Sequence, residues 1–122
     1  MLTIKDNKNQ RLIMSSENET LKITQTFYKT QESNSVVLTD DQLHEMYECL
    51  FAYKNPNWEE RLHWENPFTP THEKVYNIDE SIMFRIHGLN VIDIIQTKCG
   101  SENEEVIKIN EELFLKLYHS TI

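Results

Sequence analysis

The chain has 122 residues, of which 39% are hydrophobic and 26% charged, and its formal net charge is −8. These values are typical of a single globular domain and exclude a disordered chain. The apolar runs are too short to span a bilayer, so we expect no membrane segment and no membrane partner. The acidic charge disfavours binding to phosphate backbones and favours basic partners.

The N-terminal residues 1–10 lack the basic start and apolar stretch of a secretory signal. The two cysteines, Cys49 and Cys99, are too few for a disulfide framework. We therefore expect a cytoplasmic protein in which both thiols are reduced.

The first predicted unit spans residues 1–53. We expect strands near 1–5, 11–15 and 20–28, then a polar turn "TQESNS" and a short strand at 35–38. A helix then begins after Thr39, which forms a capping box with Gln42. Residues at i, i+3, i+4, i+7 and i+8 of this helix are apolar, the pattern of a helix packed on a sheet. They are Leu43, Met46, Tyr47, Leu50 and Phe51.

Residues 54–73 are predicted to connect this unit to a second one and to contain a short helix capped by Asn57. They hold both tryptophans and all three prolines. One interpretation is a connector whose aromatic side chains close one end of the core. The other is an exposed patch that binds a partner, because Trp and Arg are favoured interface anchors. The candidate partner-binding residues are Trp58, Arg61, Trp64 and Phe68.

Residues 74–122 form the second predicted unit, with strands near 74–78, 81–87, 91–99 and 105–109 and a helix after Asn110. They repeat the first unit, because the Gln25-Thr26 pair returns at Gln96-Thr97. We call the separation along the chain between Gln25 and Gln96 the repeat offset. At this offset apolar positions, acidic pairs and a tyrosine keep their spacing, which indicates an internal repeat.

The predicted fold class is α+β, with two pseudo-repeated β-β-β-(β)-α units whose antiparallel sheets pack on two helices. We expect Leu43 and Phe114 to be equivalent and buried. Gln25 and Gln96 lie on the strand face that meets the helix. Their amides are expected to bond backbone groups, near their own hairpin or in the neighbouring copy; the alternative is a pocket that both glutamines line.

The segment "FYK" on a strand, a polar turn, and "VVLTDDQLHEMY" entering a helix resemble the ββββα module of the single-strand-binding transcriptional coactivators, the positive-cofactor-four family. The resemblance covers residues 10–52 and, more faintly, 80–121. It implies binding of single-stranded DNA or RNA on the strand face. The candidate residues for this binding are Lys22, Phe27, Tyr28 and Lys29.

The chain shows no spacing typical of a metal or catalytic site. Its five histidines include no His-x3-His pair, so we expect no metal and no cofactor. His44 and Cys49 are five residues apart on one helix, a spacing that does not bring the two side chains together. The sequence therefore favours a protein that is not an enzyme.

Two functions are consistent with these features. The chain is rich in Asn and Ile and has a single alanine, Ala52, which resembles proteins of phages and conjugative plasmids of low-GC bacteria. The first hypothesis is a small acidic regulator or inhibitor from such a mobile element, of the anti-CRISPR or anti-defence type. It would bind a basic or nucleic-acid-binding protein, as a monomer or homodimer. The alternative is a regulator of gene expression that binds single-stranded nucleic acid.

Overall fold

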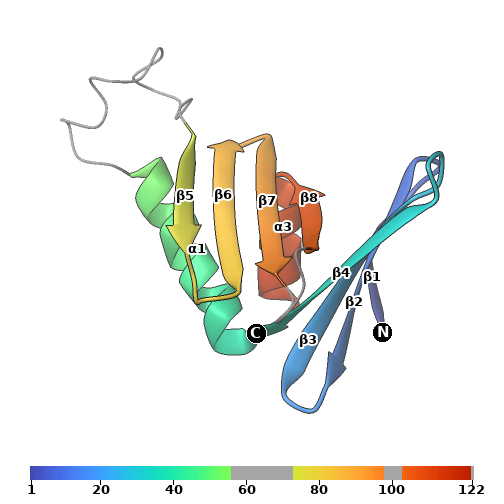
Figure 1. The fold of residues 1–122 in the computed structure, drawn as a ribbon, viewed down its shortest axis with the longest axis horizontal. Helices are drawn as coiled ribbons and strands as arrows, with labels where there is room; N and C mark the ends of the chain where they lie inside the picture. The colour runs from blue at the N-terminus through green and yellow to red at the C-terminus, as the bar shows by residue number, and fades with distance from the viewer. Residues whose placement is uncertain (56–72, 98–102, 122) are drawn as a thin grey trace.

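The computed structural model describes residues 1–55, 73–97 and 103–121. They form two four-stranded antiparallel sheets, each followed along the chain by one helix (Figure 1). The fold class is α+β, as predicted, and its β-rich architecture is duplicated. Within these residues no helix is both long enough and apolar enough to cross a membrane.

The first sheet has the strand order β1-β2-β3-β4. Its strands are β1 (Leu2–Asp6), β2 (Gln10–Glu17), β3 (Thr20–Phe27) and β4 (Glu32–Thr39), and helix α1 (Asp40–Lys54) follows. Residues 32–34, expected in the polar turn, belong to β4 instead. The turn is shorter because Gln31 takes a left-handed conformation, with φ 59°, which reverses the chain tightly.

The second sheet has the strand order β5-β6-β7-β8. Its strands are β5 (Lys74–Asn77), β6 (Ile82–Gly88), β7 (Val91–Thr97) and β8 (Glu104–Ile109), and helix α3 (Glu111–His119) follows. Its order of elements repeats that of the first sheet and α1.

The internal repeat is confirmed by the register of the strands. Ile23 pairs with Val36 in the β3–β4 hairpin, and Ile94 pairs with Ile107, so both partners are shifted by the repeat offset. Leu43 and Phe114, which were predicted to be equivalent and buried, are both fully buried.

A single residue in β6 interrupts the repeat. Gln25 pairs with Leu12, whereas Gln96 pairs with Ile82, so the two partners are separated by one position less than the repeat offset. The register of β6 against β7 shifts between Ile86 and Gly88, which makes His87 the extra residue of a β-bulge.

Helix α1 begins with the predicted capping box. The Gln42 backbone N–H donates to Thr39 Oγ1 at 3.1 Å, and the Thr39 backbone N–H donates to Gln42 Oε1 at 2.9 Å. The two acidic residues that follow in the first turn face the positive end of the helix dipole. The helix therefore starts where local chemistry directs it to start.

The predicted buried face of α1 is wrong at Phe51, which is 62% exposed, while Tyr53 is 2% exposed. The helical period explains this result. At 100° per residue, the buried residues of α1 fall within an arc of about 80°, and Phe51 lies about 120° from its centre. The buried residues are Leu43, Met46, Leu50 and Tyr53.

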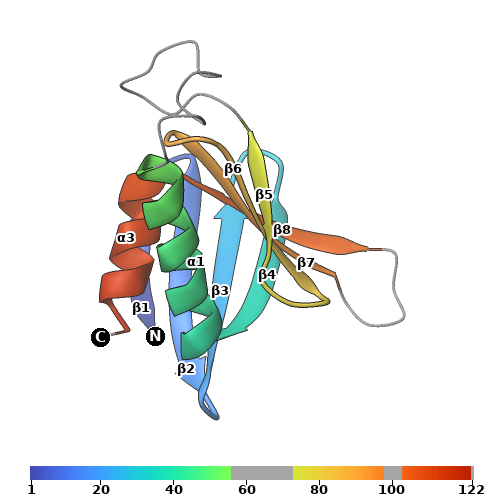
Figure 2. The ribbon, with the colours of Figure 1, turned by 90° about the vertical axis from the view of Figure 1, so that its left-hand side faces the viewer.

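The two helices lie side by side next to the sheets (Figure 2). Tyr47 of α1 stacks on Tyr118 of α3, its repeat equivalent, with ring centroids 4.2 Å apart and planes 9° from parallel. Phe84 of β6 and Phe114 of α3 also pack together, with centroids 5.2 Å apart. Buried side chains from both sheets and both helices form one core.

The repeated glutamines connect the two sheets reciprocally. Gln25 is fully buried; its Oε1 accepts from the Lys108 backbone N–H at 2.8 Å, and its Nε2 donates to the Lys108 carbonyl at 2.6 Å. Gln96 bonds Val37 in the same way, at 2.9 and 3.0 Å. Val37 and Lys108 are themselves equivalent at the repeat offset. Bonding to the neighbouring copy is therefore confirmed.

This reciprocity explains how two edge strands are protected. β4 and β8 each end their sheet, so one side of each strand has no strand partner. The amide of a glutamine offers both an acceptor and a donor, as the backbone of a further strand would. Each sheet thus supplies partners for the backbone of one residue on the edge of the other, Lys108 in β8 and Val37 in β4. This is a structural role for the repeated glutamines.

Candidate interaction surface

Exposed apolar side chains gather on the outer side of the helix pair. Phe51 of α1 is 62% exposed and borders a hollow of about 170 Å³. The hollow is lined by Tyr47, Leu50, Phe51, Lys54, Leu115 and His119. It therefore lies where α1 and α3 meet.

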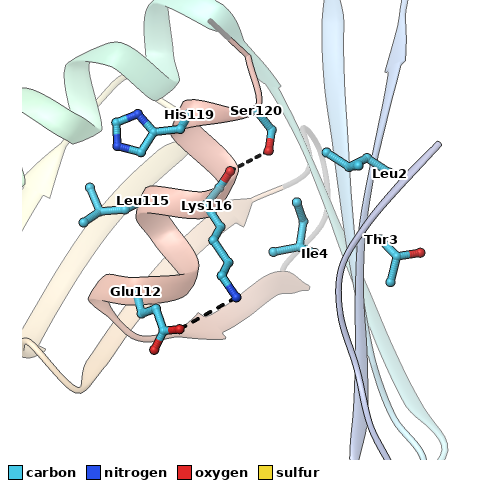
Figure 3. Close-up of a pocket in the computed structure, with 8 residues that line it drawn as sticks. All are labelled: Leu2, Thr3, Ile4, Glu112, Leu115, Lys116, His119 and Ser120. Carbon is cyan, nitrogen blue, oxygen red and sulfur yellow. Dashed lines mark hydrogen bonds and ion pairs between the residues drawn. The ribbon is translucent and has the colours of Figure 1, made fainter.

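A larger groove of about 590 Å³ lies between β1 and α3 (Figure 3). It is lined by Leu2, Thr3, Ile4, Glu112, Leu115, Lys116, His119 and Ser120. Leu2 and Ile4 point from β1 toward the helix. Because Leu2 is 44% exposed, the apolar wall of the groove is open to solvent.

The hollow and the groove share Leu115 and His119 and so form one surface. We call it the helix–β1 surface and define it by Leu2, Ile4, Tyr47, Phe51, Leu115 and His119. Its residues come from three elements that are far apart in the sequence. The groove volume is in the range of sites that hold a small molecule or an anchoring side chain.

Charged pairs surround this apolar surface. Lys54 Nζ lies 2.9 Å from Glu111 Oε2, linking α1 to α3, and Lys116 Nζ lies 3.7 Å from Glu112 Oε1 within α3. The second pair is largely exposed, so it contributes little stability and opens easily. An apolar centre with a polar rim is the usual anatomy of a protein interface.

The His44 and Cys49 side chains do not form a nucleophile–base pair. His44 Nδ1 lies 2.7 Å from the Tyr118 hydroxyl, and Nε2 lies 3.2 Å from a Glu48 carboxylate oxygen. Burial raises the pKa of the Cys49 thiol, and the carboxylates of Glu45 and Glu48 raise it further. The thiol is therefore protonated and weakly reactive at neutral pH.

A second histidine lies in a charged cluster on the second sheet. His87 Nε2 is 3.0 Å from Asp93 Oδ2, and its Nδ1 is 3.0 Å from Glu73 Oε2. Arg85 Nε lies 3.5 Å from the same Asp93 oxygen, and Asp93 is only 7% exposed. The cluster compensates a buried carboxylate next to the bulge, which is a structural role.

Of the four candidate nucleic-acid residues, Lys22 is placed apart from the three consecutive residues Phe27, Tyr28 and Lys29. Lys22 is exposed on one face of β3, whereas Phe27 lies on the opposite face, five residues further along. Tyr28 is 43% exposed and its hydroxyl donates to Asp6 Oδ1 at 2.9 Å. Lys29 is in the turn that follows. Trp58, Arg61, Trp64 and Phe68 lie outside the described residues.

The outer face of the first sheet, where Lys22 lies, is rich in hydroxyl groups. Thr24 Oγ1 lies 2.9 Å from Ser35 Oγ, and Thr26 Oγ1 lies 3.2 Å from Ser33 Oγ, each pair across β3 and β4. The charge also differs here: residues 1–39 contain five Lys and Arg against four Asp and Glu, and residues 40–122 contain seven against sixteen. The first sheet is therefore the part of the chain that is not acidic.

Among the described residues, no group of three or more His, Cys, Asp or Glu side chains could hold a metal ion. Comparison of the chain with family models, curated proteins and solved structures gives no match. The helix–β1 surface was not predicted from the sequence. The one available signal was Phe51, whose helical angle departs from that of the buried face.

Proposed function

We propose that this protein is a non-enzymatic regulator or inhibitor that acts by binding another protein through the helix–β1 surface. The observation that carries the proposal is the exposure of Phe51, 62%, and of Leu2, 44%, at two adjoining hollows. A large apolar side chain at the mouth of a hollow stabilises a complex when a partner covers it. Contiguous exposed apolar surface of this kind is typical of interaction sites.

The chemistry of the described side chains supports a binding role over a catalytic one. The Cys49 thiol is protonated by its surroundings, and each ring nitrogen of His44 and His87 already has a partner within 3.2 Å. A general base needs a free nitrogen directed at a substrate. The net charge of −8 would attract a basic partner at long range, while the apolar surface would supply the close contact.

A photo-crosslinking experiment tests this proposal. p-Benzoylphenylalanine replaces Phe51 in the full chain, and an extract of the organism that encodes it is irradiated. The matched control places the same group at Val91, which is 50% exposed in the β6–β7 hairpin. We expect a discrete adduct from position 51 that Leu2→Asp removes and that position 91 does not give. Equal adduct patterns at both positions, or none at position 51, would refute the proposal.

A second candidate function, binding of single-stranded nucleic acid, is favoured by the non-acidic, hydroxyl-rich outer face of the first sheet. The ββββα order of both units is also the order that the coactivator resemblance implies. Such binding would show as anisotropy of a labelled single strand at low salt, lost in a Lys22→Glu, Lys29→Glu double variant. Binding that survives both changes would exclude this face, since the backbone contacts of such proteins depend on local lysines.

A further inference from the structure

The basic side chains of the first sheet collect at one end of it. Residues 5–11 and 26–33 contain four Lys and Arg against two Asp and Glu, whereas the rest of residues 1–39 contains one against two. The Tyr28 backbone N–H donates to the Asn9 carbonyl at 3.0 Å, so the β1–β2 and β3–β4 turns lie side by side at this end. Both turns project away from the helices (Figure 1). We call this end the sheet tip and define it by Asp6, Lys8, Arg11, Tyr28 and Lys29.

The cations of the sheet tip are not engaged in ion pairs. Elsewhere in the chain Lys54, Arg85 and Lys116 lie 2.9, 3.5 and 3.7 Å from carboxylate oxygens. The three cations of the sheet tip form no ion pair with a described residue, and both of its lysines are exposed. These charges therefore remain available for an anion from outside the chain, and Lys and Arg bind phosphate oxygens strongly.

An exposed aromatic side chain lies among these cations. Tyr28 is 43% exposed, and its hydroxyl donates to Asp6 Oδ1 at 2.9 Å, which holds the side chain in place. Asp6 pairs with Arg11 across β1 and β2, so the two side chains lie on the same face of the sheet. The hydrogen bond to Asp6 raises the pKa of Tyr28, and the nearby charge of Arg11 opposes that rise. Bases of a nucleic acid stack on aromatic side chains placed at such a basic surface.

The second unit shows that the fold does not require this positive charge. In the order of elements the β5–β6 turn corresponds to the β1–β2 turn, and it carries Asp79 and Glu80 without any Lys or Arg. The β1–β2 turn carries Lys8, and Arg11 follows at the start of β2. The sign of the charge is thus reversed between the two copies. The scaffold leaves this turn free to differ, so its cations are available for a function.

We propose that the sheet tip binds single-stranded nucleic acid, with its three cations on the phosphates and Tyr28 stacked on a base. This inference rests on the second candidate function and specifies its site. It moves the site from the outer face of the first sheet to the two turns at its end. Lys8 and Arg11, which belong to a different hairpin from Tyr28 and Lys29, take the place of Lys22.

Two features favour a single strand over other polyanions. A duplex stacks its bases against one another and offers Tyr28 no free base. Its denser charge is also repelled more strongly by residues 40–122, which contain seven Lys and Arg against sixteen Asp and Glu. The acidic side chains of a protein segment would pair with the lysines but would not stack on the exposed ring.

Fluorescence anisotropy of a labelled thymidine oligonucleotide tests the inference on the full chain. With three phosphate contacts, the logarithm of the affinity should fall with the logarithm of the salt concentration with a slope of about −2. Lys8→Glu with Lys29→Glu should weaken binding roughly ten-fold or more and reduce the slope to about −0.7. Tyr28→Leu should weaken binding roughly five-fold or more and leave the slope unchanged, because stacking releases no counterions.

The matched control is Lys22→Glu, which makes the same change of charge in the same sheet. Lys22 precedes Phe27 by five residues of β3, a distance of roughly 17 Å, which exceeds the screening length of about 8 Å at physiological ionic strength. Lys22→Glu should therefore leave the affinity within about two-fold of the wild type, whereas Lys29→Glu alone should lower it roughly three-fold or more.

The outcomes separate this inference from the function on which it rests. Equal weakening by Lys22→Glu and Lys29→Glu would overturn the sheet tip and retain the second candidate function. A wild-type chain that does not bind the oligonucleotide would overturn both. Displacement of the oligonucleotide by polyglutamate at an equal concentration of charge would identify an acidic protein as the partner and exclude nucleic acid. An unchanged affinity of Tyr28→Leu would rule out the stacking contact.

Discussion

Replacement of Gln25 by leucine tests how the two sheets are held together. Leucine has a similar size and keeps the site apolar, but it removes all three hydrogen bonds of the amide. Two of these bonds join the backbone of Lys108, and the third joins Gln10 Oε1 at 2.9 Å. The matched variant is Gln96→Leu, which removes the equivalent two bonds to Val37.

The magnitude follows from the burial of the two sites. Gln25 is fully buried, so its removal leaves the Lys108 N–H and carbonyl without partners at about 1–3 kcal/mol for each group. Burial of the leucine side chain returns about 1–2 kcal/mol. The net cost, taken at the centres of these ranges, is about 2.5 kcal/mol. Gln96 is only half-buried, and water can replace its amide, so we expect about 1 kcal/mol there.

Urea unfolding measures both variants against the wild type. A lower midpoint with an unchanged slope reports lost stability without a change in the surface exposed on unfolding. Gln25→Leu should lower the midpoint more than Gln96→Leu. If the two variants are equally stable, or if Gln25→Leu matches the wild type, the amide does not protect the β8 edge and the reasoning fails.

Two further predictions concern the core and the thiol. Phe114→Ala should lower the free energy of unfolding by about 3–5 kcal/mol, because the ring is fully buried against Phe84, whereas Phe51→Ala should change it by less than about 0.5 kcal/mol. Similar losses for the two variants in urea unfolding would contradict the assignment of Phe114 to the core and Phe51 to the surface. With Cys99 replaced by serine in all chains, the pH at which iodoacetamide labels Cys49 at half its maximal rate should lie above that of free cysteine, because the raised pKa delays formation of the thiolate. Glu48→Gln should lower this pH, and a value at or below that of free cysteine would contradict the prediction.

The fold was predictable where local chemistry decides it. Helix α1 starts at a capping box that four residues encode, and β3 shows the alternation of buried residues that a half-buried strand requires. The bulge at His87 was missed because a gapless offset assumes equal strand lengths. The alternation of Ile82, Phe84 and Ile86 was a usable signal. At the repeat offset these apolar residues align with positions 11, 13 and 15 of β2, whereas the buried residues of β2 are at 12 and 14.

The candidate site could not be predicted in the same way. The groove brings Leu2 and Ile4 next to Leu115 and His119, which lie near the opposite end of the sequence. Such a contact depends on how the two sheets cross, and residues close together in the sequence do not encode that crossing. Periodicity also assigned Phe51 to the core, because a residue eight positions after Leu43 lies near the same face of the helix. The buried residues Met46, Leu50 and Tyr53 place the centre of that face on the other side of Leu43, away from Phe51.

The repeat itself indicates where function should lie. Positions that keep the same role in both copies, such as Gln25 and Gln96, join the two units to each other through their hydrogen bonds. Two identical units would also present two identical grooves, and a regulator built that way would bind two equal partners or one symmetric partner. Among the described residues the two copies differ in what they leave accessible: Phe51 of α1 is 62% exposed, whereas its repeat equivalent lies outside the described residues, and Leu2 beside α3 is 44% exposed. The proposed function places the binding surface at these unequal positions, because a partner that contacts them distinguishes one copy from the other.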